Sequence, residues 1–134
     1  MDPSNPIRVL IAEDDEGVRD ILASVVSSEP SFELAGAVED ADEAVEMAAR
    51  ELPDVALVDV RMPGGGAAAT RGIKQRSPGT RVLAFSAHDD ALTMQEMRDA
   101  GADGYVVKGS AVAEIIESIR CAAAAGPASG QLAA

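Results

Sequence analysis

The stretch "VLIAEDDEGV", from Val9 to Val18, places four carboxylates directly after four apolar residues. A short continuous apolar run of this kind is typical of a buried strand. Charges beside a hydrophobic core are costly unless they are paired or hold a ligand. The stretch therefore indicates a strand that delivers a functional acidic cluster to the edge of a sheet.

Five short apolar runs alternate with segments of helical character along the chain. The runs cover residues 7–12, 32–38, 54–60, 80–86 and 104–108. Because they are continuously apolar, both faces of their sheet are expected to be covered by helices. This order predicts an α/β fold of three layers, in which a five-stranded parallel sheet lies between two layers of helices.

The helices are marked by apolar spacing and by capping residues. Apolar positions recur at helical spacing over residues 18–26 and 112–122. Asp40 followed three residues later by Glu43 predicts a capping box for the second helix, and Ser110 is a plausible cap for the last. Two less periodic helices are expected near residues 67–76 and 90–100.

The composition limits the classes of function. Eleven Lys and Arg against 23 Asp and Glu give a net charge of −12. This charge repels nucleic acid and anionic lipid, so neither direct nucleic acid contact nor a membrane partner is expected. One cysteine, Cys121, excludes an intrachain disulfide and favours a reducing compartment. With no apolar run of spanning length and no signal-like start, the predicted localisation is cytoplasmic.

Polar residues follow four of the five apolar runs. They are Glu13, Asp14 and Asp15 after the first, Asp59 in the third, Ser86 in the fourth and Lys108 in the fifth. In a parallel sheet these positions meet at one edge. Clustered carboxylates repel one another, and Mg²⁺, which prefers oxygen ligands, relieves that repulsion. The hydroxyl and the ammonium suit a phosphoryl group, so Asp59 is either a metal ligand only or also a carboxylate nucleophile.

Four motifs at these positions, "AEDD", "LVDVRMPGG", "AFSAHD" and "GYVVKG", resemble the receiver domain of bacterial two-component response regulators. The resemblance covers about residues 7–125 and is greatest to receivers of the nitrate-regulator (NarL/LuxR) type. It implies a flavodoxin-like sheet with strand order 2-1-3-4-5. It also implies a receiver domain over residues 1–125, followed by a tail or the start of a linker over residues 126–134.

The resemblance implies a signalling switch in a phosphorelay, not an enzyme with separate substrate turnover. Asp59 would accept a phosphoryl group from a sensor histidine kinase and become an aspartyl phosphate, which changes a protein-interaction surface. A homodimer is a further expected partner state. Receivers of this type usually precede a DNA-binding helix-turn-helix domain, so an effector domain for transcription regulation is expected outside these residues.

The family's functional residues map onto positions of this sequence. The metal ligands for Mg²⁺, or Mn²⁺, would be Glu13, Asp14, Asp59 and the backbone carbonyl of Arg61. The residues that contact the phosphoryl group would be Ser86 and Lys108, and the switch residues would be Ser86 and Tyr105. Asp15 lies one place past the acidic pair and is not expected to be a ligand. No organic cofactor is implied. His88 is expected to be an exposed loop residue beside the site.

The sequence departs from the family pattern at four places, one of which is Ser86 in place of the commoner threonine. Gly109 follows the lysine where the family usually has a proline with a cis peptide bond, and a cis bond before a non-proline residue costs about 2.5–4 kcal/mol. Glu13 replaces the commoner aspartate. The run Gly64 to Gly66 predicts a flexible loop after the third strand.

Three other functions compete with this interpretation. A phosphorylation-independent dimerisation or docking module of the same fold is the main alternative, although a degenerate site usually loses one of its members. A flavin- or nucleotide-binding domain would need a Gly/Ser/Thr-rich loop after the first strand, where this chain has four acids. A phosphatase with an aspartyl nucleophile would need a second acid shortly after Asp59, where Val60, Arg61 and Met62 follow.

Overall fold

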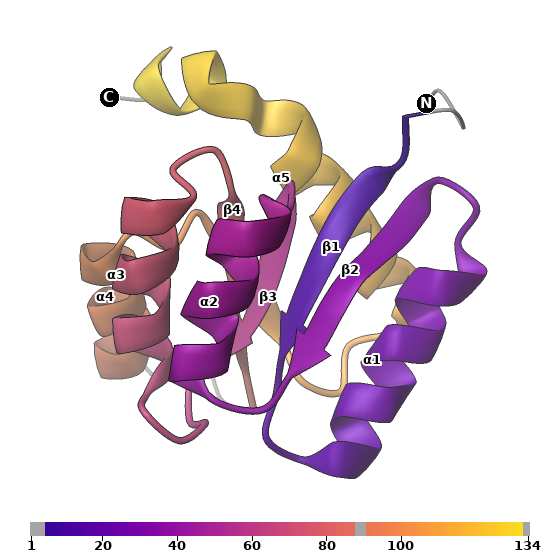
Figure 1. The fold of residues 1–134 in the computed structure, drawn as a ribbon, viewed down its shortest axis with the longest axis horizontal. Helices are drawn as coiled ribbons and strands as arrows, with labels where there is room; N and C mark the ends of the chain where they lie inside the picture. The colour runs from indigo at the N-terminus through magenta and orange to yellow at the C-terminus, as the bar shows by residue number, and fades with distance from the viewer. Residues whose placement is uncertain (1–4, 88–90, 133–134) are drawn as a thin grey trace.

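The five apolar runs form one parallel sheet in a computed structural model that describes residues 5–87 and 91–132, with side chains up to residue 125. Its strands are β1 (Ile7–Ala12), β2 (Phe32–Val38), β3 (Val55–Asp59), β4 (Arg81–Ser86) and β5 (Gly104–Val107). Their order is β2-β1-β3-β4-β5. The predicted α/β class, parallel sheet and strand order are therefore confirmed (Figure 1).

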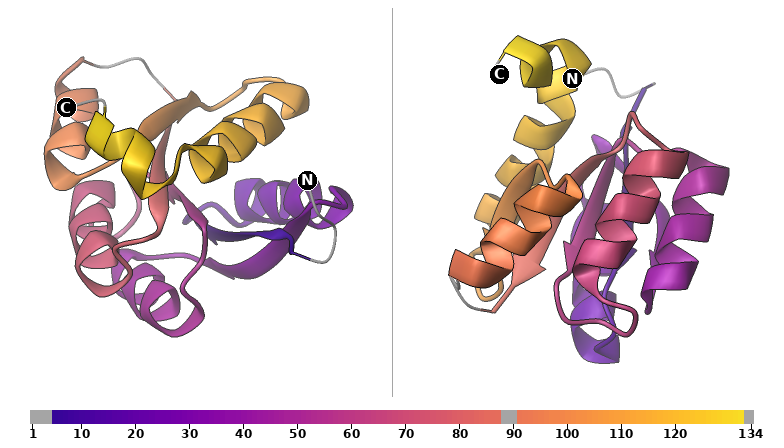
Figure 2. Two further views of the ribbon diagram at one scale, coloured as in Figure 1. Left: turned by 90° about the horizontal axis from the view of Figure 1, so that it is seen from above. Right: turned by 90° about the vertical axis from the view of Figure 1, so that its left-hand side faces the viewer.

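Helices cover both faces of the sheet, which gives the predicted three layers (Figure 2). They are α1 (Glu16–Ser28), α2 (Ala41–Glu51), α3 (Gly66–Arg76), α4 (Ala91–Ala100) and α5 (Val112–Leu132). One core cluster joins α1 and α5 to the sheet, and a second joins α2, α3 and α4 to the opposite face. Both cores consist mainly of Val, Leu, Ile, Ala and Met, as the low aromatic content requires.

The helix starts show where capping was predicted well and where it was not. Asp40 caps α2, because its Oδ1 accepts the Glu43 amide at 2.9 Å, and Glu43 Oε1 accepts the Glu39 amide at 3.2 Å. The predicted cap Ser110 is wrong. The carbonyl of Ala111 accepts the amides of Glu114 and Ile115, which places Ala111 at the N-cap of α5. Glu114 Oε1 in turn accepts the Ala111 amide at 3.1 Å.

The end of α5 differs from the sequence expectation. Residues 126–132 are helical, where a tail without regular structure was expected. Residues 122–125 are four alanines, the strongest helix formers, and they carry the helix toward this segment. Figure 1 shows α5 bending in its last part. Pro127, which belongs to this helix, has no amide hydrogen to donate to the helical hydrogen bonds. The domain boundary at residue 125 stays a prediction.

Within the described ranges, no helix combines the length and the apolar character needed to cross a bilayer.

Candidate functional site

Three carboxylates meet at the carboxyl end of the sheet. Glu13 and Asp14 follow β1 directly, and Asp59 ends the neighbouring strand β3. Oxygen atoms of the three side chains lie within 4.8 Å of one another. Glu13 and Asp59 are 1% and 2% exposed, whereas Asp14 is exposed. Strand pairing thus brings Asp59 together with two residues that are 45 and 46 positions before it in the sequence.

Lys108 faces this acidic group from the loop after β5. Its Nζ lies 3.2 Å from Glu13 Oε1 and 3.3 Å from Asp59 Oδ1. The ammonium also lies 5.4 Å from the centre of the Phe85 ring, within the range of a cation–π contact. The distance from Lys108 Nζ to Glu13 Oε1 is that of an ion pair, but the two groups do not form a hydrogen bond. The buried Oε1 oxygen of Glu13 therefore has an ionic neighbour and no hydrogen-bond donor among the described residues.

The electrostatics separate the two members of the acidic pair. Burial raises the pKa of Glu13 above its usual value, and the charge of Asp59 acts in the same direction. Hydrogen bonding with the Asp59 side chain lowers the pKa of the exposed Asp14. Burial alone would lower the pKa of Lys108, but its contacts with Glu13 and Asp59 outweigh that effect and raise it. Lys108 therefore stays charged, and its one positive charge is shared between two buried acids.

The turn after β3 fixes the position of Asp59. The Arg61 amide donates to Asp59 Oδ1 at 3.2 Å. A Cβ atom on Gly66 would lie 2.6 Å from Val60 Cα and 2.7 Å from the Asp59 carbonyl oxygen, so only glycine fits against the strand end. Gly64 and Gly65 have φ angles of 87° and 88°, which favour glycine. The glycine run thus has a steric and conformational role in addition to the loop flexibility that its sequence predicted.

Ser86 lies at the end of β4 beside this group, and Tyr105 lies on the neighbouring strand β5. Ser86 is buried at the end of β4, and its carbonyl oxygen accepts the Lys108 amide at 2.7 Å. Tyr105 is half-buried, pairs with Ala84 across the sheet and packs on the core beneath α4. The structure therefore places Ser86 at this edge, and it places Tyr105 two residue pairs farther back along the sheet. Their movement stays a prediction, and His88 lies outside the described residues.

The peptide bond after Lys108 is trans, as are all others in the described ranges. Gly109 adopts a φ of 91°, a left-handed conformation that proline cannot reach and that glycine accepts without strain. The substitution of glycine for the family's usual proline therefore comes with a different backbone path. Lys108 still reaches both buried carboxylates along this path.

The donor set fits a hard divalent cation. Glu13, Asp14 and Asp59 offer only oxygen atoms, which suit Mg²⁺ or Mn²⁺ better than zinc. The site carries an excess of negative charge, because the one ammonium of Lys108 lies beside both Glu13 and Asp59 and a third carboxylate, Asp14, is close by. Asp15 is occupied elsewhere, because its Oδ1 accepts the Val18 amide at 3.0 Å and caps α1. This agrees with its exclusion from the expected ligands.

Comparison with known proteins identifies the family. The family described as "Response regulator receiver domain" matches residues 9–120, more than four fifths of the chain. The chain belongs to this family. The assignment agrees with the four sequence motifs and with the strand order of the sheet.

The receiver domain is similar to transcriptional regulators and to one solved receiver in particular. It is 35% identical over 123 residues to the transcriptional regulatory protein DegU of Brevibacillus brevis, which covers 91% of this chain and 52% of that protein. It is 34% identical to a probable transcriptional regulatory protein NarL of Mycobacterium tuberculosis, over 87% and 56% of the two chains. The solved receiver domain of a response regulator NarL from that organism superposes with a TM-score of 0.83 at 33% identity, covering 88% and 97%. The chain thus spans about half the length of these curated relatives and resembles the NarL/LuxR type.

Two residues of the receiver domain contact the site but were missed from the sequence. Arg19, in the first turn of α1, donates to backbone carbonyls of the acidic loop. Phe85 supports the Lys108 ammonium. Arg19 was hidden because a single arginine on a helix has the appearance of a solvated surface residue. Phe85 was hidden because an aromatic residue in a strand has the appearance of ordinary core.

Proposed function

We propose that this receiver domain is a Mg²⁺-dependent phosphoacceptor switch of a two-component system. A carboxylate oxygen of Asp59 attacks the phosphorus of a phosphohistidine on a sensor kinase. The new O–P bond forms as the P–N bond breaks, and the imidazole leaves with the bonding electrons. The observation that carries the proposal is the position of Asp59, buried beside two acids and 3.3 Å from an ammonium.

The chain's own residues orient the reaction. The Arg61 amide holds Asp59 Oδ1, which fixes the direction of the nucleophile. Glu13, Asp14, Asp59 and the Arg61 carbonyl would hold the divalent cation, which supplies positive charge to the transferring phosphoryl group. Lys108 exchanges its contact with Asp59 for a phosphoryl oxygen, and Ser86 donates a hydrogen bond to another. These contacts exist in only one of two conformations, and they shift the equilibrium between them.

The output is a changed protein surface, and no substrate is turned over. Inward movement of Tyr105 would alter the surface formed by α4 and β5, where Met94, Met97 and Arg98 line a cavity of about 120 Å³ with Tyr105. The relatives are transcriptional regulators about twice as long as the matched region. A DNA-binding helix-turn-helix effector domain is therefore an expected partner, and a homodimer is a second one. The proposed localisation is the cytoplasm, where a regulator reaches its DNA.

The test is intact mass spectrometry after incubation with acetyl phosphate, with and without Mg²⁺. The expected result is a gain of one phosphoryl group that requires Mg²⁺ and that is absent in Asp59→Asn. Asp54→Asn, at the opposite end of the same sheet, is the matched control and should gain the phosphoryl group like the wild type. If the wild type gains no mass and binds no Mg²⁺ in a titration, the phosphorylation-independent docking module replaces the proposal.

A further inference from the structure

Arg19 links the acidic loop to a neighbouring loop of the sheet edge. Its Nη1 donates to the Glu13 carbonyl at 2.9 Å and lies 3.4 Å from the Asp14 carbonyl. Its Nη2 lies 3.8 Å from Glu39 Oε2, just after β2. The side chain is only 17% exposed, although arginine is usually a surface residue. The guanidinium thus contacts the backbone of Glu13 and Asp14, two of the three residues whose carboxylates form the site.

The place of Arg19 on its helix is electrostatically unfavourable. It is the fourth residue of α1, close to the positive end of the helix dipole, where a cation is destabilising. The last turn of α1, where a cation would be favourable, contains no basic residue. The carbonyl groups of the acidic loop are the partners that offset this cost, because a charged donor makes stronger hydrogen bonds than a neutral one.

We infer that Arg19 is a positioning residue for the divalent cation, and this rests on the proposed function. Arg19 holds the backbone of Glu13 and Asp14 from the side away from the ion, so that their carboxylates stay directed at one point. The backbone of this loop also holds the Glu13 carboxylate directly, because the Asp15 amide donates to Glu13 Oε2 at 3.0 Å. Without Arg19, the Glu13 carbonyl loses a charged donor and the loop gains freedom.

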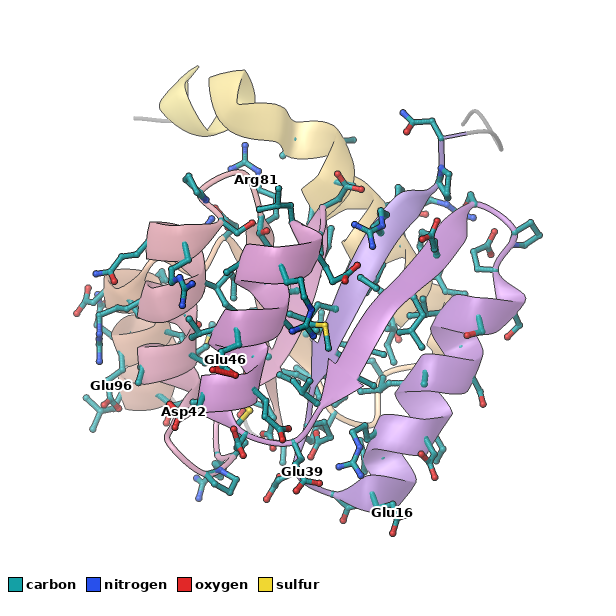
Figure 3. All side chains as sticks on the ribbon, in the orientation of Figure 1. Glu16, Glu39, Asp42, Glu46, Arg81 and Glu96 are labelled. Atoms are coloured by element: carbon teal, nitrogen blue, oxygen red, sulfur yellow. The ribbon has the colours of Figure 1, made fainter. Side chains whose placement is uncertain are left out.

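Glu39 gives the guanidinium its direction. It is 62% exposed and pairs with Arg19 only weakly, so it contributes orientation and little stability. Figure 3 shows Glu39 at the carboxyl end of the sheet, near the start of α1 marked by Glu16. The β1–α1 and β2–α2 loops are thus tied through one side chain, and the backbone bond from the Glu13 amide to the Val38 carbonyl at 2.9 Å reinforces the tie.

The test compares Arg19→Gln, Arg19→Lys and the control Arg120→Gln. Arg120 pairs with Glu29 at 3.0 Å and with the ring of Phe32 at the other end of the sheet, so its replacement removes the same charge without touching the acidic loop. Mg²⁺ affinity is measured by calorimetry on folded protein. Arg19→Gln should weaken Mg²⁺ binding by about tenfold, as expected for a group that orients ligands. Arg19→Lys should bind with intermediate affinity, and Arg120→Gln should stay within twofold of the wild type.

A second readout needs no metal. Hydrogen exchange of the Asp15 amide, followed by NMR in metal-free protein, reports the geometry of the acidic loop. It should be several-fold faster in Arg19→Gln than in the wild type and unchanged in Arg120→Gln. Equal Mg²⁺ affinity and equal exchange in Arg19→Gln and wild type overturn the inference. If the wild type binds no Mg²⁺, the proposed function fails instead, and the exchange rates alone decide whether Arg19 positions the loop.

Discussion

The two ends of the sheet treat acidic groups in opposite ways. At the amino end, Asp103 accepts hydrogen bonds from Lys74 Nζ at 2.6 Å and from the Val82 amide at 2.9 Å. At the carboxyl end, three carboxylates meet, and the one ammonium of Lys108 is shared between Glu13 and Asp59. Figure 3 shows Arg81 at the first end and Glu39 at the second. The same fold thus satisfies its acids where they stabilise it and leaves them unsatisfied where a ligand is expected.

Asp103 shows what a satisfied acid contributes. Besides Lys74 and Val82, it lies 3.4 Å from Arg81 Nη1, and its side chain is 27% exposed. Lys74 also donates to the Thr80 carbonyl at 2.8 Å. Through these bonds Asp103 joins α3, β4 and the loop before β5. Charge-assisted hydrogen bonds of this kind contribute more than neutral ones, because the ionised donor and acceptor attract each other more strongly.

The largest effect is therefore expected at the amino end. Asp103→Ala should lower the free energy of unfolding by about 2 kcal/mol, because it leaves the amide of the buried Val82 without its acceptor and removes two solvent-screened ion pairs. Urea denaturation followed by far-UV circular dichroism measures this in a chain without tryptophan. Asp99→Ala is the control, because Asp99 is exposed and accepts only from Gln95, and it should change stability by less than about 0.5 kcal/mol. Equal losses in both variants would refute the contrast between the ends.

The carboxyl end should respond with the opposite sign. Asp59→Asn should raise the free energy of unfolding of metal-free protein by about 1–2 kcal/mol, because it removes one of three mutually repelling carboxylates. The amide oxygen can still accept the Arg61 amide, and Lys108 keeps Glu13. The same urea titration, made in chelator, measures the difference. Adding Mg²⁺ should stabilise the wild type and leave Asp59→Asn almost unchanged.

A matched substitution at the amino end makes this second prediction specific. Asp54 Oδ2 accepts the Arg8 amide at 2.8 Å, and no other acid of the described ranges pairs with that amide. Asp54→Asn should therefore leave stability unchanged or slightly lower. A loss of stability in Asp59→Asn as large as that expected for Asp103→Ala would show that the carboxyl end is not destabilised by its acids.

The sequence was informative where a continuous apolar run or the end of a strand determines the position of a residue. All five strands were predicted to within one residue of their observed bounds, because continuous apolar runs leave few alternatives. The convergence of Glu13, Asp14, Asp59 and Lys108 followed from the parallel sheet, since strand ends share one edge. Their roles in phosphotransfer stay predictions.

The network at the amino end could not be predicted in the same way. Asp103 and Lys74 lie 29 residues apart, and each has the appearance of an ordinary surface charge in the sequence. Only the approach of α3 to the loop before β5 brings them together. The start of α5 was missed for a related reason, because a serine one position early has the same signature as a true cap. Side-chain pairing between loops depends on tertiary geometry that no local pattern records.

The smallest effect is expected for Glu33→Gln. It tests whether the exposure of an ion pair, and not its presence alone, decides how much the pair stabilises the amino end of the sheet. Arg8 Nε lies 3.3 Å from Glu33 Oε2, and Glu33 is 53% exposed. The guanidinium keeps Glu51 at 2.7 Å when Glu33 is removed. Glu33→Gln should therefore change the free energy of unfolding by less than about 0.5 kcal/mol. The loss should vanish in 1 M salt, which screens exposed pairs, while the loss in Asp103→Ala should persist. A loss in Glu33→Gln comparable with that of Asp103→Ala would mean that the amino end is stabilised by its total charge pairing, and that the bond from Asp103 to the Val82 amide has no special weight.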